Sequence, residues 1–141
     1  MERAPPLVLD SSIAVKWFSK EIDSHKALDL LNRFQASEIT LCVMDFLFIE
    51  VANALRYKPS SDPVFLNNVI GLMYDLKLVS YPHSTEILQR ASEISFDAEV
   101  SLYDAIPVAL AEQLDTYCIT ADRRTQYNKL SVKQYPVKML E

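Results

Sequence analysis

Four carboxylic acids stand where predicted strands end or predicted helices run. Asp10 directly follows the apolar run 7–9, and Asp122 lies just past the run 117–120. Asp104 stands near the start of one predicted helix, and Glu50 lies among mostly apolar neighbours in another. In open α/β sheets, ligands bind beyond the carboxyl ends of the strands. We therefore expect these side chains to converge into one negatively charged pocket at an edge of a sheet.

Acids gathered in this way have a definite chemistry. Four carboxylates at one edge repel one another, so at neutral pH some stay protonated unless a cation compensates their charge. Hard divalent cations such as Mg²⁺ prefer oxygen ligands of this kind. A metal ion held there can activate a water and offset the charge of a phosphodiester under attack. The pattern therefore indicates a Mg²⁺ or Mn²⁺ site suited to phosphodiester hydrolysis.

Each acid taken alone has a purely structural explanation. Asp10 and Asp104 could each cap the helix that follows, and Asp122 could begin a turn. Glu50 could be a solvated or ion-paired residue on a helix surface. The metal-site hypothesis therefore depends on the joint placement of the acids and not on any one of them.

The surrounding pattern predicts strands and helices in alternation. Short apolar or β-favouring runs predict strands at 7–9, 39–43, 78–81 and 117–120, with an edge strand at 133–139 that contains Pro136. Helical spacing predicts helices over 13–18, 25–34, 45–57, 63–77, 85–96, 101–114 and 123–130. This alternation is typical of an α/β fold around a mainly parallel sheet of four to five strands. We expect a single domain over residues 1–141, with residues 1–6 as a short tail.

Local signals add detail to these helices. Ser11 or Ser12 is the expected N-cap of the first helix, and Ser24 that of the second. Pro107 is expected in the first turn of its helix, because a proline deeper inside removes a backbone hydrogen bond. This places Asp104 at or near the start of that helix.

Composition excludes several classes of protein. The chain of 141 residues has a single glycine, Gly71, so it holds neither a Walker A loop nor a dinucleotide-binding fingerprint. A net charge of −5 argues against a broad basic surface that wraps nucleic acid. Cys42 and Cys118 lie in apolar runs and are expected to be buried thiols. No apolar stretch has the length of a membrane span or of a signal peptide, so we expect a cytoplasmic protein.

Four segments together resemble the PIN domain, and within it the VapC toxins of prokaryotic toxin–antitoxin pairs. The first, LVLDSSIAVKWF, is similar to the opening strand of that family and its first aspartate. The second, DFLFIEVANAL, carries a glutamate with an asparagine three residues later. The third and fourth, SLYDAIPVALAEQL and TYCITADRR, are the most specific. Their order and spacing match over nearly the whole chain.

The resemblance implies a three-layer α/β/α fold with strand order 3-2-1-4-5 and an Mg²⁺- or Mn²⁺-dependent ribonuclease whose product carries a 5′-phosphate. It implies catalytic and metal-binding roles for Asp10, Glu50, Asp104 and Asp122. Ser12 and Thr120 would support the ligands, and Asn53 would orient Glu50 or a water. A homodimer and a cognate antitoxin protein are also implied.

Two questions stay open from the sequence. Lys16, Arg123 and Arg124 lie near the motifs and are either a phosphate-facing rim for RNA or ordinary solvated surface. The alternative function is a PIN-fold binding or regulatory module with little or no catalysis, which would not need four acids. A phosphatase with an aspartate nucleophile is disfavoured, because Asp10 lacks a second aspartate two residues later.

Overall fold

A five-stranded parallel sheet forms the centre of the molecule. In this computed structural model, which describes residues 4–141, the strands lie in the order β3-β2-β1-β4-β5. All pairings between neighbouring strands are parallel. The strands are β1 (Pro6–Leu9), β2 (Thr40–Met44), β3 (Val79–Tyr81), β4 (Cys118–Thr120) and β5 (Val137–Met139). The predicted strand order is confirmed.

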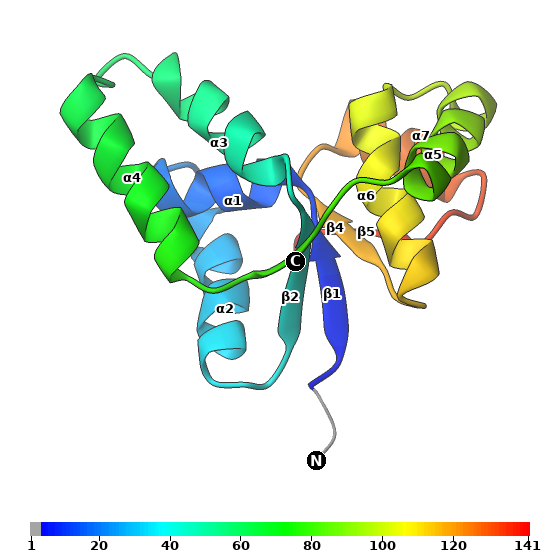
Figure 1. Cartoon of the computed structure of the whole chain (residues 1–141), viewed down its shortest axis with the longest axis horizontal. Helices are drawn as coiled ribbons and strands as arrows, with labels where there is room; N and C mark the ends of the chain where they lie inside the picture. The colour runs from blue at the N-terminus through cyan, green and yellow to red at the C-terminus, as the bar shows by residue number, and fades with distance from the viewer. Residues whose placement is uncertain (1–3) are drawn as a thin grey trace.

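Helices cover both faces of this sheet, which confirms the three-layer arrangement (Figure 1). One face carries α1 (Ser11–Phe18), α2 (Ser24–Gln35), α3 (Leu47–Arg56) and α4 (Pro63–Asp75). The other face carries α5 (Thr85–Ala98), α6 (Leu102–Gln113), the π-helix η1 (Arg123–Tyr127) and α7 (Asn128–Ser131). Within the described residues, no helix has the length and apolarity needed to cross a membrane.

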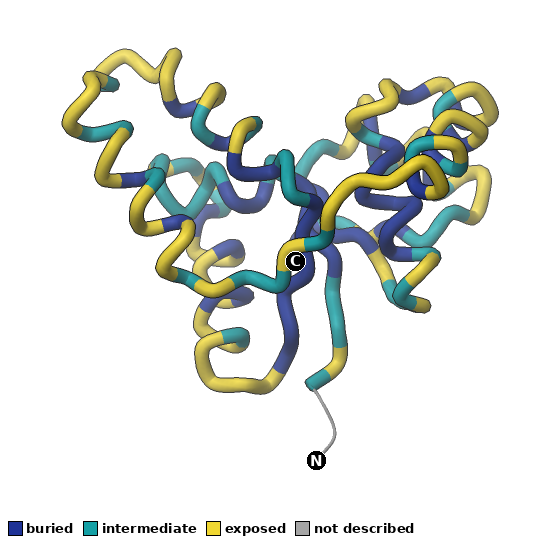
Figure 2. Tube along the Cα trace, viewed as in Figure 1, coloured by how far each residue is buried: buried dark blue, intermediate teal, exposed yellow. Residues whose placement is uncertain are grey.

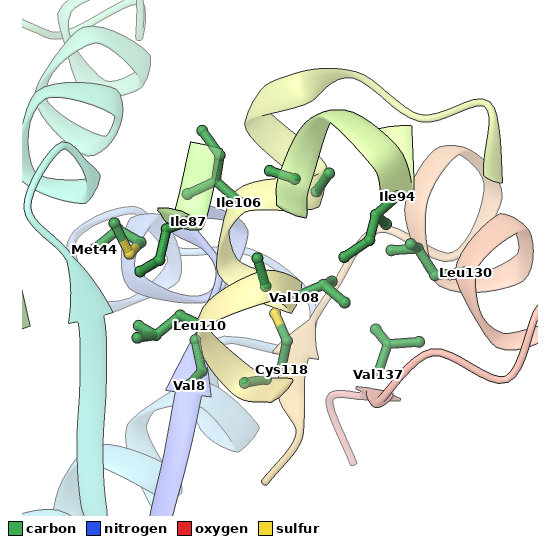
Figure 3. Close-up of a cluster of buried hydrophobic side chains, with 14 of the residues drawn as sticks. Val8, Met44, Ile87, Ile94, Ile106, Val108, Leu110, Cys118, Leu130 and Val137 are labelled. Carbon is green, nitrogen blue, oxygen red and sulfur yellow. The ribbon is translucent and has the colours of Figure 1, made fainter. Parts of the chain in front are cut away.

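Successive side chains of each strand point to opposite faces of the sheet, so the apolar core is divided into two clusters. Val8 and Cys118 face α5 and α6, whereas their neighbours Leu9 and Ile119 face α1 and α3. Figure 3 shows the first cluster, where Val8 and Cys118 lie beside Leu110 of α6. All residues of β2 are buried, and Figure 2 shows the buried trace concentrated in the sheet and on the inner sides of the helices. As expected, both cysteines are buried.

Three helix starts differ from the prediction or refine it. The N-cap of α1 is Asp10, not Ser11 or Ser12, and the Asp10 carboxylate makes no capping bond. The N-cap of α2 is Asp23, because the Ser24 hydroxyl instead donates to the Ser19 carbonyl at 3.0 Å. The Asp104 backbone N–H donates to the Ser101 hydroxyl at 3.1 Å, which places Asp104 in the first turn of α6 as predicted.

Pro107 lies in the second turn of α6, and the prediction that it occupies the first turn is wrong. A proline there leaves the carbonyl of Tyr103 without its usual intrahelical donor. The Pro107 ring is buried and lines a small cavity with Leu9 and Met44 of the sheet.

Both ends of the chain also depart from the predicted bounds. β1 already begins at Pro6, and the backbone N–H of Thr40 donates to the Pro5 carbonyl at 2.9 Å. Residues 4–6 therefore contact the sheet and are not a free tail, while residues 1–3 of the predicted tail lie outside the described part. The predicted edge strand is confirmed as β5, but it begins only at Val137, after Pro136.

Candidate metal site

Asp10 lies where β1 passes into α1, with 8% of its surface exposed. One of its carboxylate oxygens, Oδ2, accepts a hydrogen bond from the Ser12 hydroxyl at 2.6 Å and another from the Thr120 hydroxyl at 2.7 Å. Hydroxyl-to-carboxylate bonds of this length are charge-assisted and stronger than neutral ones. Asp10 is therefore held in one orientation at the carboxyl edge of the sheet, between β1 and β4.

The two hydroxyls are themselves held by the backbone after β4. Ser12 Oγ accepts from the Ala121 N–H at 3.0 Å, and Thr120 Oγ1 accepts from the Asp122 N–H at 3.1 Å. The turn that carries Asp122 is thus tied to the residues that hold Asp10. The structure brings both Ser12 and Thr120 to Asp10, as the resemblance implied. Ser12 and Thr120 are themselves separated by more than a hundred residues along the chain.

Glu50 and Asp104 reach the same edge from two helices. The Glu50 N–H donates to the Phe46 carbonyl at 3.1 Å, in the first turn of α3. Asp104 lies in the first turn of α6 on the opposite face of the sheet. The two helix starts therefore approach Asp10 from the two sides of β1.

Burial and mutual repulsion raise the pKa of two of these acids. Burial, with the charges of Asp10 and Asp104, raises the pKa of Glu50 to about 7. Burial, with the charges of Asp10 and Asp122, raises the pKa of Asp104 to about 6, against smaller opposing effects of a hydrogen bond with Ser101 and of the Lys129 charge. Asp104 therefore feels the charges of both Asp10 and Asp122, and Glu50 those of Asp10 and Asp104, as like charges do when they lie near one another.

The acids are not drawn together into a ready-made cage. Among residues 4–141, no three Asp, Glu, His or Cys side chains are arranged so that they could hold a metal ion. The Asp122 carboxylate accepts from the backbone N–H and the hydroxyl of Thr125. A cavity of about 10 Å³, lined by Asp10 and Glu50 among others, has room for about one water. The chemistry of the donors fits a small hard cation, and the side chains would have to rotate inward to hold it.

The remaining predicted residues divide into two groups. Arg123 and Arg124 are exposed and directly follow Asp122, and the Arg123 guanidinium lies over the Tyr127 ring, 5.6 Å from its centre. Lys16 is already engaged, because its ammonium pairs with Asp23 at 2.8 Å and its side chain is only 11% exposed. Asn53 is exposed and lines a groove between α3 and α4, and no hydrogen bond joins it to Glu50 within the described residues.

Sequence reasoning missed Gln126 as a member of the site. Its side chain is 2% exposed, and its amide lies 3.0 Å from the Thr120 hydroxyl, which also contacts Asp10. It belongs to η1, and single π-turns are frequent at functional sites. The spacing of six residues from Thr120 matches no ordinary helical contact, so the sequence carries no signal for it.

Solved structures share the fold at low sequence identity. The DNA-bound VapBC of Salmonella typhimurium matches with a TM-score of 0.69 and 12% identity, covering 97% of this chain and 99% of that chain. VapC20 of Mycobacterium tuberculosis, described as a toxin that cleaves the sarcin-ricin loop, gives 0.68 and 12%, covering 92% and 95%. A toxin–antitoxin complex from Klebsiella pneumoniae gives 0.64 and 17%, covering 84% and 88%.

A family-level match covers most of the chain and includes the site. No protein with a curated description matches. The PIN domain model matches residues 7–130, a range that contains all four acids, both supporting hydroxyls and Gln126. With the parallel sheet in the order β3-β2-β1-β4-β5 and the acids at its carboxyl edge, this match shows that the chain belongs to the PIN domain family.

Proposed function

We propose that this protein is a metal-dependent endoribonuclease that acts as the toxin of a toxin–antitoxin pair. The observation that carries the proposal is the set of four acids, Asp10, Glu50, Asp104 and Asp122, near the carboxyl edge of the sheet, where burial and the charges of the neighbouring acids raise the pKa of Glu50 and Asp104. A folded protein retains such repulsion at a cost in stability, and a cation would relieve it. A module that only binds a partner has no need of repulsion between buried acids.

The four acids would hold Mg²⁺ or Mn²⁺. When bound, the ion lowers the pKa of a water and offsets the negative charge of the phosphodiester. Ser12 and Thr120 keep the Asp10 carboxylate in place through their hydroxyl donors. Arg123 and Arg124 follow Asp122 at the rim and are the cations nearest in sequence for contact with RNA phosphates. Lys16 is left out, because its charge is already paired.

An antitoxin and a second copy of the chain are the proposed protein partners. The groove between α3 and α4 has a volume of about 410 Å³ and is lined mainly by apolar side chains, with Ile49 71% exposed and Tyr74 58% exposed. A contiguous apolar surface of this kind is typical of a protein interface. The chain would act in the cytoplasm, where its RNA substrate lies.

Removing a proposed metal ligand tests the nuclease. We expect the purified protein to cut single-stranded RNA with Mn²⁺ or Mg²⁺, to leave 5′-phosphate ends, and to stop when EDTA is added. Asp10→Asn and Asp104→Asn are each expected to lower the cleavage rate by more than about 100-fold. Even mutating a residue that only supports a metal ligand commonly lowers metal affinity or activity by about 10- to 100-fold. Gel analysis of an end-labelled RNA measures the rates.

The matched control is Asp29→Asn, which changes an exposed aspartate on α2 outside the site. It is expected to cut at the parent rate, and circular dichroism should show all three variants folded. Parent-like rates in Asp10→Asn and Asp104→Asn would eliminate the proposal.

Growth measurements test the toxin assignment separately from the chemistry. Induced expression of the parent chain in a bacterial host should arrest growth, and expression of Asp10→Asn should not, because arrest follows from cleavage of RNA. Co-expression of the product of the adjacent gene should restore growth. Normal growth with an active parent enzyme would identify a nuclease that is not a toxin.

The raised pKa of Glu50 predicts how stability depends on pH in the metal-free protein. The pKa is about 7 in the folded protein and 4.5 ordinarily, so the folded state binds more protons between these values. The free energy of unfolding therefore falls as the pH rises from 4.5 to 7. Glu50→Gln removes this charge and should stabilise the protein by roughly 1 kcal/mol near pH 8, after allowance for solvent screening, and hardly at all near pH 4.

Urea unfolding at the two pH values with EDTA present measures the difference. Glu86→Gln is the control, because Glu86 is an exposed glutamate at the start of α5. It should give no stabilisation near pH 8. If Glu50→Gln destabilises the protein at both pH values, repulsion at this site is refuted.

The hydrogen bonds around Thr120 assign a positioning role to Gln126. The Thr120 hydroxyl has one proton but two acceptors, Asp10 Oδ2 at 2.7 Å and Gln126 Oε1 at 3.0 Å, while the buried Gln126 Nε2 has no partner. Exchanging the amide oxygen and nitrogen of Gln126 resolves this conflict. Gln126 then donates to Thr120, and Thr120 donates to Asp10.

We therefore expect Gln126→Leu to raise the Mn²⁺ concentration needed for half-maximal cleavage by about 10- to 100-fold, with a smaller effect at saturating Mn²⁺. Manganese titrations of the cleavage rate measure this. Gln89→Leu, at an exposed position of α5, should leave the titration unchanged. An unaltered Mn²⁺ requirement in folded Gln126→Leu would show that Thr120 holds Asp10 unaided.

A further inference from the structure

We propose that Tyr103 and Phe46 form a stacking platform that holds one unpaired base of the RNA beside the acids. This inference rests on the proposed function, since it takes the ligand to be RNA, and it names the substrate class as single-stranded. In a duplex both faces of every base are already stacked, so an exposed ring can engage only an unpaired base.

The two rings meet edge to face at the mouth of the site. Their centroids are 6.1 Å apart and the ring planes lie at 73°. Phe46 is partly buried, whereas Tyr103 is 66% exposed. The contact with Phe46 supports the Tyr103 ring from one side and leaves most of it open to solvent. An open aromatic ring anchored in this way can stack on a flat ligand.

Both residues connect directly to the proposed metal ligands. Phe46 lines the small cavity together with Asp10 and Glu50, and its carbonyl accepts the Glu50 N–H at 3.1 Å. Tyr103 immediately precedes Asp104 in the first turn of α6. Because the Tyr103 ring contacts Phe46, which lines that cavity, a base stacked on Tyr103 would bring the adjoining phosphodiester towards the acids.

The platform is held in place before any ligand binds. The Asp45 N–H donates to the Tyr81 carbonyl at 2.8 Å, and the Asp45 carboxylate pairs with the His83 ring at 3.0 Å. These contacts fix the turn from which Phe46 emerges. The Ser101 cap fixes the first turn of α6, which carries Tyr103. A preorganised ring loses little conformational freedom on binding, which favours affinity.

The charge of the chain favours a contact of this kind. With a net charge of −5 and four acids at the site, the protein repels the phosphates of RNA. Base stacking does not depend on charge, and it tolerates any base because each has an aromatic face. Tyr103 therefore supplies affinity where a basic surface is lacking.

Fluorescence of 2-aminopurine tests the platform without relying on cleavage. The probe is a short single-stranded RNA with one 2-aminopurine, titrated with protein that carries Asp10→Asn so that the strand stays intact. Stacking on Tyr103 should quench the fluorescence. Adding Tyr103→Ala should abolish the quenching and weaken binding by roughly 10-fold or more, whereas Tyr103→Phe should retain both. The same probe in a duplex should show no quenching that depends on Tyr103.

Tyr57→Ala is the matched control, because Tyr57 is 76% exposed at the far end of α3 and is not part of the site. It should behave like the parent. The platform is overturned if Tyr103→Ala binds and quenches as Tyr57→Ala does, or if no RNA binding is measurable. It is also overturned if Tyr103→Ala impairs capture of a protein partner and leaves RNA binding intact.

These outcomes separate the platform from the nuclease. If the parent protein cuts RNA and the Tyr103→Ala variant still quenches the 2-aminopurine fluorescence, the stacking platform is refuted and the nuclease proposal stands. If the parent does not cut RNA but quenching depends on Tyr103, the nuclease fails and the platform stands as an RNA-binding surface.

Discussion

Acidic side chains lie close enough at the carboxyl edge of the sheet for burial and repulsion to raise the pKa of Glu50 and Asp104, although no three of the described residues form a ready-made metal cage. Two hydroxyl donors fix Asp10, Ser12 from the start of α1 and Thr120 from β4. Helix starts on opposite faces of the sheet bring the glutamate and the third aspartate alongside. The parallel order of the strands makes this convergence possible, because every strand ends at the same edge.

The same cluster of acidic side chains also limits how a polyanionic substrate such as RNA could bind, because it repels the phosphates. The attraction must be local, because the chain as a whole is acidic. The proposed contacts fall into two kinds, the arginines that follow Asp122 and the aromatic pair of Phe46 and Tyr103. They border the site through different segments, η1 in one case and the starts of α3 and α6 in the other. Each contributes binding without adding a broad basic surface.

The sequence predicted the strands and most helices to within a few residues, because buried runs and helical spacing are local signals. The ends of helices were harder to place. Among residues 4–141, five residues other than glycine adopt a positive φ, and each lies within three residues after a helix: Ser37, Lys77, Glu99, Asp115 and Gln134. A glycine usually marks such a position, but the one glycine of this chain lies inside α4. The usual marker of a helix end is therefore missing from the sequence.

By itself, the sequence determined the family to which the chain belongs, since its motif segments lie within a PIN domain match over residues 7–130. Only the tertiary structure decided which other side chains serve the site. The Gln126 side chain contacts the Thr120 hydroxyl. Lys16 forms ion pairs with Glu21 and Asp23, which precede α2. The Phe46 ring, before α3, packs edge to face against the Tyr103 ring of α6. The identity of a residue and of its sequence neighbours sets its preference for helix, strand or turn. Its partner is set by how distant segments pack, and no short stretch of sequence encodes that.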